Sequence, residues 1–192
     1  RLMIKVSNQI ITWIAHEILR QPSASARTKA IGKAIQIAIL LNEKNNFNGV
    51  KEITAGLCLS SIQRLKKAWS AVKPKFKQAY NDLTDKVANM QSLRNLPHSV
   101  NPPLVPYLGV YLTDLVFIED GNPNTFEEDG LTFINFRKMS IMGEVLMEIS
   151  SYQQERYCFL KIDDLYNYLL VMEAHSDTEL HALSQTAEPK KR

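Results

Sequence analysis

Apolar residues recur at steps of three and four positions along most of the chain, which is the spacing of helices that bury one face. The first such stripe consists of Val6, Ile10, Trp13, Ile14 and Ile18. It predicts a helix that ends near Pro22, after which Ser23 or Ser25 offers a cap for a second helix running to the polar residues 42–48. Alternation of period two, which marks strands, is scarce, so we expect an all-α domain.

Shorter helices are predicted in the middle of the chain. One covers about residues 50–59, and another begins near Ser60 or Ser61 and continues to Trp69. Lys73-Pro74 ends the latter, because proline clashes with the preceding helical turn. A further stripe consists of Phe76, Tyr80, Leu83 and Val87. Residues 162–172 predict one more short helix, and from His181 the tail turns polar.

The most informative stretch is residues 101–124, which read NPPLVPYLGVYLTDLVFIEDGNPN. Prolines precede the apolar run 105–118, and Gly121 with Pro123 ends it. Glu119 and Asp120 would then lie at the C-terminal end of a helix, where the helix dipole disfavours negative charge. Carboxylates in that unfavourable position indicate presentation to a partner.

A second long helix is predicted beyond an acidic connector. Its apolar positions are Ile134, Ile141, Val145, Leu146 and Ile149, and it ends around residues 152–154. The connector, residues 120–130, contains Glu127, Glu128 and Asp129 among turn-forming residues. Two helices joined in this way predict a helical hairpin at about residues 103–152.

Composition fits one sizeable core, since the chain has 192 residues of which 45% are hydrophobic. Its 23 basic and 20 acidic residues leave a net charge of +3, and the basic clusters at 64–67, 73–77 and 190–192 are typical of solvated helix faces. Nucleic-acid binding would need a basic stripe interleaved with aromatic residues, so we expect no nucleic-acid partner.

The two cysteines, Cys58 and Cys158, lie far apart in apolar sequence, which predicts buried thiols in a reducing compartment and no disulfide. No apolar run is long enough to predict a transmembrane segment, and the N-terminal residues do not form a signal peptide. Because the chain starts at Arg1 already in a helical pattern, we expect it to be an excerpt of something longer.

The sequence contains no recognisable motif of catalytic or metal-binding residues. The four histidines and two cysteines lack metal-ligand spacing, and no glycine-rich phosphate loop or Gly-x-Ser-x-Gly elbow occurs. The adjacent acids at 127–129 and 163–164 are typical of surface turns. We therefore expect a binding protein that uses no metal and no cofactor, and not an enzyme with bond chemistry.

Several stretches together resemble the catalytic domain of Ras-family guanine-nucleotide exchange factors (RasGEF), of the Son-of-sevenless-like class. They are residues 8–13 with 17–19, 45–48, 64–67 with Trp69, 102–123, 134–136, 152–154 and 183–184 with 188–189. The run Leu-Gly-Val-Tyr-Leu-Thr-Asp-Leu, with Gly-Asn-Pro after it, is close to a family signature. The resemblance implies one RasGEF catalytic domain over residues 1–192 that lacks its first helices, an all-helical bowl with a protruding helical hairpin.

The resemblance also implies roles for single residues. Val116 would lie where the first hairpin helix meets the magnesium site of a small GTPase, and Asp120 would be the carboxylate that reaches the phosphate-binding loop. Further contacts on the hairpin would be Tyr107, Thr113 and Asn122. The surface that meets the second switch of the GTPase would comprise Arg27, Leu57, Cys58, Ser60 and Gln63. Residues with a structural role would be Asn46, Asn48, Arg64, Trp13 and Trp69.

Several of these residues also have an ordinary structural interpretation. Val116 fits a core position of an amphipathic helix, and Asp120 fits a turn before Gly-Asn-Pro. Thr113 fits a hydrogen bond within its own helix. Arg27 fits a surface position or an ion pair.

The leading hypothesis is an exchange factor that promotes GDP release from a Ras- or Rap-type GTPase, in the cytoplasm and recruited peripherally to membranes by other parts of the parent chain. Cys58, Ser61 and Gln63 depart from the family pattern, which commonly has a polar residue, a proline and in some members an aromatic. These departures favour an alternative, a non-catalytic GTPase-binding or scaffold module with a degenerate exchange-factor fold. A third hypothesis is an unrelated helical adaptor whose groove takes a partner helix.

Overall fold

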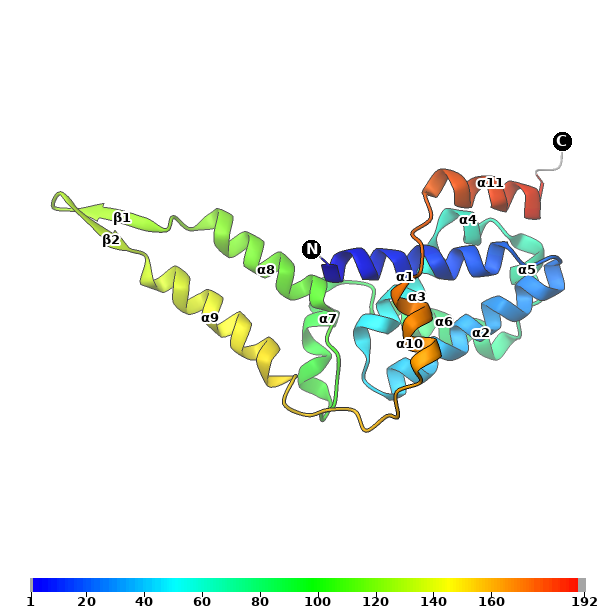
Figure 1. Cartoon of the computed structure of the whole chain (residues 1–192), viewed down its shortest axis with the longest axis horizontal. Coiled ribbons are helices and arrows are strands. Elements are labelled where there is room, and N and C mark those ends of the chain that lie inside the picture. Colours follow the sequence, from blue (N-terminus) through cyan, green and yellow to red (C-terminus); the bar gives the residue numbers. More distant parts are fainter. Residues whose placement is uncertain (1, 190–192) are drawn as a thin grey trace.

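The computed structural model describes residues 2–189, apart from the side chains of residues 2 and 3, and is helical except for one short β-hairpin (Figure 1). The elements in the first part of the chain are α1 Leu2–Leu19, α2 Ala24–Glu43, α3 Phe47–Cys58, α4 Ser60–Gln63, α5 Lys66–Ser70, α6 Pro74–Lys86, α7 Met90–Asn95 and the 3₁₀ turn η1 Pro97–Ser99. Those in the second part are α8 Leu108–Gly121, β1 Thr125–Glu128, β2 Leu131–Ile134, α9 Phe136–Ser151, α10 Asp163–Leu170 and α11 Asp177–Ala187. The all-α fold class predicted from the sequence is confirmed.

The molecule has two parts, which we call the body and the arm. The arm comprises residues 108–151, that is α8, β1, β2 and α9, and it projects away from the remaining helices (Figure 1). The body consists of α1 to α7 together with α10 and α11, which return to it after the arm. The protruding helical hairpin expected from the sequence is therefore present.

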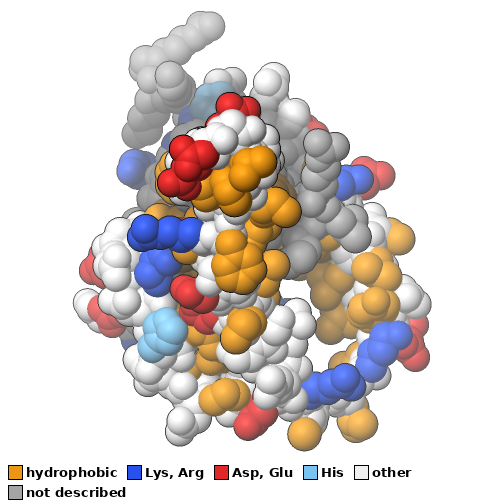
Figure 2. All heavy atoms as spheres, turned by 90° about the vertical axis from the view of Figure 1, so that its left-hand side faces the viewer, with side chains coloured by type: hydrophobic (Ala, Val, Ile, Leu, Met, Phe, Trp, Pro, Cys, Tyr) orange, Lys and Arg blue, Asp and Glu red, His pale blue; other side chains and the backbone are white. Residues whose placement is uncertain are grey.

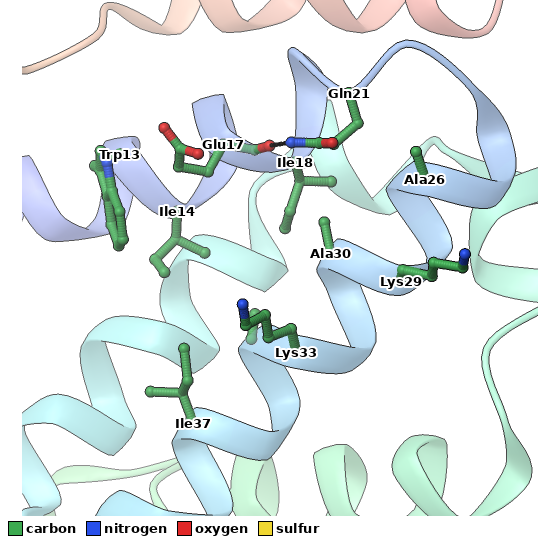
Figure 3. Close-up of a pocket in the computed structure, with 11 residues that line it drawn as sticks. Trp13, Ile14, Glu17, Ile18, Gln21, Ala26, Lys29, Ala30, Lys33 and Ile37 are labelled. Carbon is green, nitrogen blue, oxygen red and sulfur yellow. Dashed lines mark hydrogen bonds between the residues drawn. The ribbon is translucent and has the colours of Figure 1, made fainter.

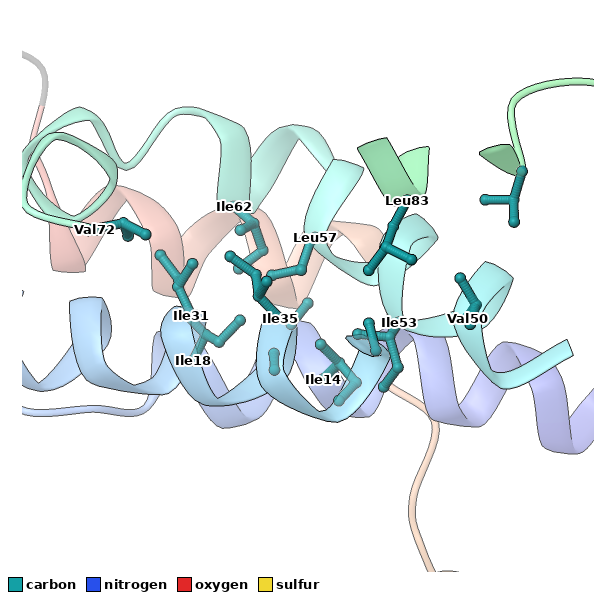
Figure 4. Packing of buried hydrophobic residues seen from close by; sticks show 14 of the residues in the cluster. Ile14, Ile18, Ile31, Ile35, Val50, Ile53, Leu57, Ile62, Val72 and Leu83 are labelled. Carbon is teal, nitrogen blue, oxygen red and sulfur yellow. The ribbon is translucent and has the colours of Figure 1, made fainter. Parts of the chain in front are cut away.

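The core of the body lies where α1 and α2 pack on α3 (Figure 4). Its fully or almost fully buried side chains include Ile14, Ile18, Ile31, Ile35, Val50, Ile53, Leu57 and Ile62. Each such side chain contributes about 1.5–3 kcal/mol through removal from water. At Gly56 the backbones of α1 and α3 approach closely, because a Cβ atom there would lie 2.8 Å from the carbonyl oxygen of Ile11.

Of the two caps predicted for α2, Ser23 is the one that the structure uses. Ser23 accepts a hydrogen bond from the Ala26 amide at 3.1 Å and caps α2, while Ser25 lies inside that helix. Helix α3 begins three residues before the predicted start, because Asn46 accepts from the Gly49 amide at 2.8 Å and so caps it. Pro74 occupies the first turn of α6, where a missing N–H does no harm.

The single helix predicted from Ser60 to Trp69 is divided into α4 and α5, with a break at Arg64 and Leu65. The carboxylate of Glu188 accepts hydrogen bonds from the amides of Lys67 and Ala68 at 3.2 and 3.1 Å. These amides belong to the first turn of α5, where backbone N–H groups lack a helical partner. The residue that caps α5 thus comes from the other end of the chain, which explains why local periodicity did not predict the break.

The C-terminal tail, expected to be polar, contains helix α11. Its buried residues, Leu180 and Ser184, face the body, and Ser184 donates to the carbonyl oxygen of Ser61. The guanidinium of Arg64 donates to the carbonyl oxygens of Ser184 and Glu188, the second at 2.8 Å. A largely polar helix is therefore held by α1 and α4, which lie far away in sequence.

The connector between the two arm helices is a β-hairpin and not a simple turn. Strands β1 and β2 pair antiparallel, with Phe126 opposite Phe133 and Glu128 opposite Leu131. Asp129 and Gly130 form the two-residue turn with φ angles of 51° and 75°, the combination that favours Asp-Gly. Ile134, predicted on the second helix, is in β2, and α9 begins at Phe136.

The prediction of buried thiols was wrong, because Cys58 and Cys158 are both exposed and both free. Cys58 is the last residue of α3 and its side chain points away from the core that contains Leu57. Cys158 lies in the extended segment before α10. Within residues 2–189, no helix combines the length and the apolar character that crossing a membrane requires.

Candidate partner-binding surface on the arm and the body

The root of the arm is fixed to the body by polar contacts. Arg94 on α7 donates two hydrogen bonds to the carboxylate of Asp114 on α8, at 2.6 and 2.7 Å. Where α8 begins and α9 ends, the hydroxyls of Tyr111 and of Tyr152, the residue after α9, both donate to Oε1 of Glu148, at 2.8 and 2.9 Å. Burial, and then the neighbouring tyrosine and glutamate, raise the pKa of Tyr111, so this hydroxyl stays a donor. These bonds hold the start of α8 to α7 on one side and to the end of α9 on the other.

One face of α8 carries the hairpin residues predicted to contact a partner. Gly109, Thr113, Val116 and Asp120 follow one another at steps of four, three and four residues, so they share one side of the helix. The Tyr107 ring covers the first of these positions, because a Cβ atom on Gly109 would lie 2.5 Å from it. Val116 is 55% exposed. We call this face, with the Tyr107 ring, the α8 stripe.

Thr113 and Asn122 make hydrogen bonds within α8. The Thr113 hydroxyl donates to the carbonyl oxygen of Gly109 at 2.7 Å, and the Asn122 amide donates to that of Ile118 at 3.0 Å. Both residues are half-buried, so each keeps part of its surface accessible next to the stripe.

The two carboxylates at the end of α8 differ in their surroundings. Glu119 forms an ion pair with the buried Lys138 of α9, with 2.9 Å between Oε2 and Nζ. Asp120 is exposed, and no ion pair to it is formed by the residues that the structure describes. Asp120 is thus the carboxylate left accessible at the end of the stripe.

The residues predicted to meet the second switch do not all reach the surface. Leu57 is fully buried in the core. Arg27 is 7% exposed, and its guanidinium donates to the carbonyl oxygens of Gln21 at 2.7 Å and Ala187 at 3.0 Å. Both side chains are therefore buried in the structure and do not lie on a contact surface. Their burial results from tertiary packing, which the resemblance in sequence does not show.

The other three residues of that set lie together at the end of α3. Cys58 and Ser60 are exposed, and Gln63 is half-buried. The Cys58 Sγ lies 3.0 Å from the hydroxyl of Tyr80, to which the Gln63 amide also donates at 3.3 Å. Burial and the neighbouring Cys58 raise the pKa of Tyr80, so the phenol remains protonated. We call the surface around these four residues the floor.

Three adjoining hollows connect the α8 stripe with the floor. The first, of about 150 Å³, lies between α1, α3 and the start of α8 and is lined by Tyr107 and Leu112. It shares Lys51 and Ala55 with a second hollow, of about 430 Å³, that reaches Cys58 and Leu59. Leu59 in turn lines a third, of about 590 Å³, together with Ser60 and residues of α11. The three hollows thus follow one another from the start of the arm across the body, and together we call them the concave surface.

Exposed apolar side chains extend along the arm beyond the stripe (Figure 2). The most exposed of them are Phe117, Leu131, Ile134, Phe136 and Met147. Seen from the side towards which the arm projects, acidic side chains lie close to apolar ones (Figure 2). Such a concentration of apolar surface, rimmed by charge, is typical of a protein–protein contact.

The residues predicted to be structural make internal contacts. Asn46 caps α3, and Asn48 donates to Glu52 Oε1 at 2.7 Å. Trp13 and Trp69 are half-buried against the core, and their ring nitrogens donate to the Tyr168 hydroxyl and the Ile62 carbonyl at 3.0 and 3.1 Å. Arg64 joins α4 to α11 through the bonds described above.

A separate groove of about 510 Å³ runs between α1 and α2 (Figure 3). Its lining combines the apolar Trp13, Ile14 and Ile37 with the charged Glu17 and Lys33. None of the residues predicted for partner contact lines it, so this groove is not part of the concave surface.

Three possible metal ligands, His16, His175 and Glu179, have ligand atoms within 4.8 Å of one another. The two imidazole rings are stacked, with centroids 3.8 Å apart and an interplanar angle of 13°. One ion cannot lie in the planes of two stacked rings, and His175 Nδ1 is already 3.1 Å from Glu179 Oε1. We interpret the cluster as a contact that holds the start of α11 on α1.

Sequence reasoning missed the polar residues that support the stripe. Arg94, Asp114 and Glu148 look like ordinary surface residues of amphipathic helices. Lys138 gave no signal of burial, because lysine is rarely buried without a partner and its partner, Glu119, is 19 positions away. The β-hairpin had a recognisable signal, the Asp-Gly pair between two alternating segments.

The family model and the similar proteins indicate the same family. The model of the RasGEF domain family matches residues 1–140. Ras-specific guanine nucleotide-releasing factor 1 of Mus musculus is 40% identical over 187 residues, which cover 95% of this chain and 15% of that protein. Ras guanine nucleotide exchange factor Y of Dictyostelium discoideum is 35% identical over 190 residues, covering 97% of this chain and 12% of that protein. The chain spans less than a fifth of the length of these relatives.

Proposed function

Since the chain belongs to the RasGEF domain family, we propose that it is a guanine-nucleotide exchange factor for a Ras-subfamily GTPase, which it opens with the arm. The names of the relatives support the class of partner, because they describe guanine-nucleotide release or exchange on Ras. The observation that carries the proposal is the α8 stripe, which presents Val116 and Asp120 on an arm beside a concave surface. Peripheral recruitment to membranes stays a prediction.

Asp120 acts on the phosphate-binding loop of the GTPase. Such a loop holds the nucleotide phosphates with oriented backbone amides and a lysine. An accessible carboxylate competes for these groups, and each charge-assisted hydrogen bond it forms is worth about 1.5–3 kcal/mol. Asp120 thereby stabilises the loop in its nucleotide-free state.

Val116 acts on the magnesium ion. Mg²⁺ requires oxygen ligands in octahedral geometry, and an apolar side chain offers none. A half-exposed valine inserted beside the ion therefore disfavours metal binding, and loss of the metal weakens the hold on GDP. Each 1.4 kcal/mol by which the nucleotide-bound state is destabilised accelerates release about tenfold.

The floor and the hollows hold the GTPase while the arm acts. Cys58, Ser60 and Gln63 offer small polar groups beside the second switch, and the hollow around Ala55 accepts side chains between floor and stripe. Binding of the chain and binding of the nucleotide then weaken one another to the same extent, because the coupling between two sites is reciprocal.

Release of a fluorescent GDP analogue from Ras-type and Rap-type GTPases tests the proposal. We expect this chain to accelerate release from at least one of them, and Asp120→Asn to lower that rate at least tenfold by loss of one charge-assisted bond. Asp129→Asn is the matched control, because it removes an exposed acid from the hairpin turn and should leave the rate unchanged.

If no GTPase of either type releases its nucleotide faster, the proposal is wrong. Stable binding of a GTPase without faster release would instead support the alternative of a non-catalytic binding module. The structural observation that favours this second function is Cys58, which is exposed in the floor and forms a hydrogen bond with the Tyr80 hydroxyl. In that case Asp120→Asn leaves the affinity for the GTPase unchanged.

A further inference from the structure

Lys138 is a buried cation at the end of the first arm helix. Its side chain is 1% exposed although it belongs to the first turn of α9. Its ammonium lies 2.9 Å from Glu119 Oε2 and donates to the Glu119 carbonyl oxygen at 3.2 Å and to Asn124 Oδ1 at 2.6 Å. All three donors of the ammonium are thus directed at the last turn of α8 and the segment after it.

Negative charge accumulates at the end of α8, so a cation at this place is stabilising. The free carbonyl groups of the last turn give a helix a partial negative charge at its C-terminus. Glu119 and Asp120 add two carboxylates at the same place, so each repels the other and the carbonyl groups. Lys138 offsets this charge from the buried side of the turn, where solvent screening is weak.

The segment that follows Asp120 is held by a second set of bonds from α9. The side chain of Asn135 donates to the Pro123 carbonyl oxygen at 2.9 Å and accepts from the Lys138 amide at 3.1 Å. The Asn135 backbone amide donates to the Asn124 carbonyl oxygen at 2.8 Å. Lys138 and Asn135 therefore fix the turn on both sides, and the start of α9 determines where α8 ends.

We propose that Lys138 is the positioning residue for Asp120. It pairs with Glu119 and keeps the last turn of α8 wound, so that Asp120 is the one carboxylate directed to a partner. The two adjacent acids thus have different roles, Glu119 within the arm and Asp120 outside it. This inference rests on the proposed function, since it concerns the residue that acts on the phosphate-binding loop.

Kinetics of nucleotide release test the inference. We expect Lys138→Met to lower the maximal release rate about tenfold while the chain concentration that gives half the maximal rate changes less than threefold. In an Asp120→Asn background the same substitution should change the maximal rate less than twofold, because Lys138 acts through Asp120. Arg137→Met, which removes the exposed neighbouring cation, is the matched control and should leave both quantities unchanged.

An equal loss in both backgrounds, or no loss in either, would overturn the inference. Glu119→Gln is a second variant in case Lys138→Met does not fold. It leaves the buried ammonium without its carboxylate, so that Asp120 is drawn towards Lys138, and we expect the maximal rate to fall at least threefold. An unchanged rate in Glu119→Gln would also contradict the positioning role.

Amide hydrogen exchange separates this inference from the proposed function. Lys138→Met should accelerate exchange of the amides at residues 119–124 at least tenfold, with the body unchanged, whether or not a GTPase is present. If the unmodified chain releases no nucleotide, the proposed function is wrong, and unchanged protection of these amides would then show that Lys138 does not hold the turn either. If the unmodified chain is active and Lys138→Met equals it, only the inference fails.

Discussion

At the scale of the residue, a few polar side chains join segments that are far apart in the sequence. Arg64 and Glu188 are the clearest pair, because the guanidinium of one satisfies carbonyl oxygens near the end of α11 and the carboxylate of the other caps α5. The cluster of His16, His175 and Glu179 similarly fixes the start of α11 to α1. Loss of one such residue leaves several polar groups without partners.

Replacing Arg64 with methionine should therefore destabilise the whole body. Removal of the guanidinium takes the donor from the Glu188 carbonyl oxygen and removes the bonds to the Ser184 carbonyl oxygen and hydroxyl. We therefore expect the free energy of unfolding to fall by about 2–4 kcal/mol. Urea unfolding followed by circular dichroism measures this loss. Lys66→Met, at an exposed position of α5, is the control, and a loss below 1 kcal/mol in Arg64→Met would contradict the role given to Arg64.

His16 should make stability depend on pH. Burial, and then the neighbouring His175, lower the pKa of His16 below 6.5, its usual value. The unfolded chain then binds a proton more readily than the folded chain, so this contribution is complete above pH 6.5 and is lost as the pH falls through the lowered pKa. The other charged groups facing His16 are Glu17, Arg20 and Glu179.

The measurement is the difference in unfolding free energy between the unmodified chain and His16→Gln from pH 5 to 8. We expect the unmodified chain to lose stability relative to His16→Gln as the pH falls below 6.5. A difference that stays constant over this range would exclude His16 as the origin of the pH dependence.

At the scale of the element, local signals determined most helices, and tertiary contacts determined the rest. The stripes of α1, α2 and α6, the cap at Ser23 and the helix break before Pro74 were predictable, because they depend on residues within a few positions. Positions 113, 116 and 120 share one side of α8 because of helical spacing, whereas their choice as contact residues came from the resemblance to the family. The break between α4 and α5, helix α11 and the burial of Arg27 and Leu57 depend on partners elsewhere in the chain, which no local pattern contains.

A substitution at Gly130 should disrupt the turn of the β-hairpin without destabilising the body. Gly130 has a φ angle of 75°, which a β-branched residue adopts only with strain. Because an isolated two-stranded hairpin is marginally stable, we expect Gly130→Val to abolish the pairing of β1 and β2. Nuclear Overhauser contacts between Phe126 and Phe133 would disappear, while the unfolding temperature of the body should change by less than about 1 °C.

Gly143 provides the contrasting substitution on the same arm. It lies within α9, and a Cβ atom there would meet nothing within 4 Å. Gly143→Ala should stabilise α9 by about 0.5–1 kcal/mol, since alanine loses less conformational freedom in a helix. Slower amide exchange along α9 would show this gain, and faster exchange would contradict it.

At the scale of the whole molecule, burial is distributed unevenly between the body and the arm. Only Val110, Tyr111 and Lys138 are buried among the residues of the arm, whereas α1 to α3 contribute most of the core. The resemblance in sequence indicated a bowl with a hairpin. The concave surface between them could not be predicted, because each hollow is lined by elements distant in the sequence.

This distribution predicts two levels of protection against amide hydrogen exchange. Amides of α1, α2 and α3 should exchange only through global unfolding, whereas those of α8 and α9 should open locally and exchange at least tenfold faster. Mass spectrometry of peptides from the two parts measures the difference. Equal protection in the arm and the body would show that they unfold as one unit.

The hydrogen bonds of Tyr111 and Tyr152 to the same glutamate join the first turn of α8 to the last turn of α9. Because the two helices are joined at this end, the number of helical turns beyond it sets how far Asp120 lies from the body. Adding seven residues to α8 and seven to α9 would move the end of α8 outward by about 10 Å and turn it by only about 20°. Adding four to each would extend it by about 6 Å but turn it by about 40°. Paired insertions of this kind would thus change the position of Asp120 and leave the core of the body, to which α8 contributes only its first turn, unchanged.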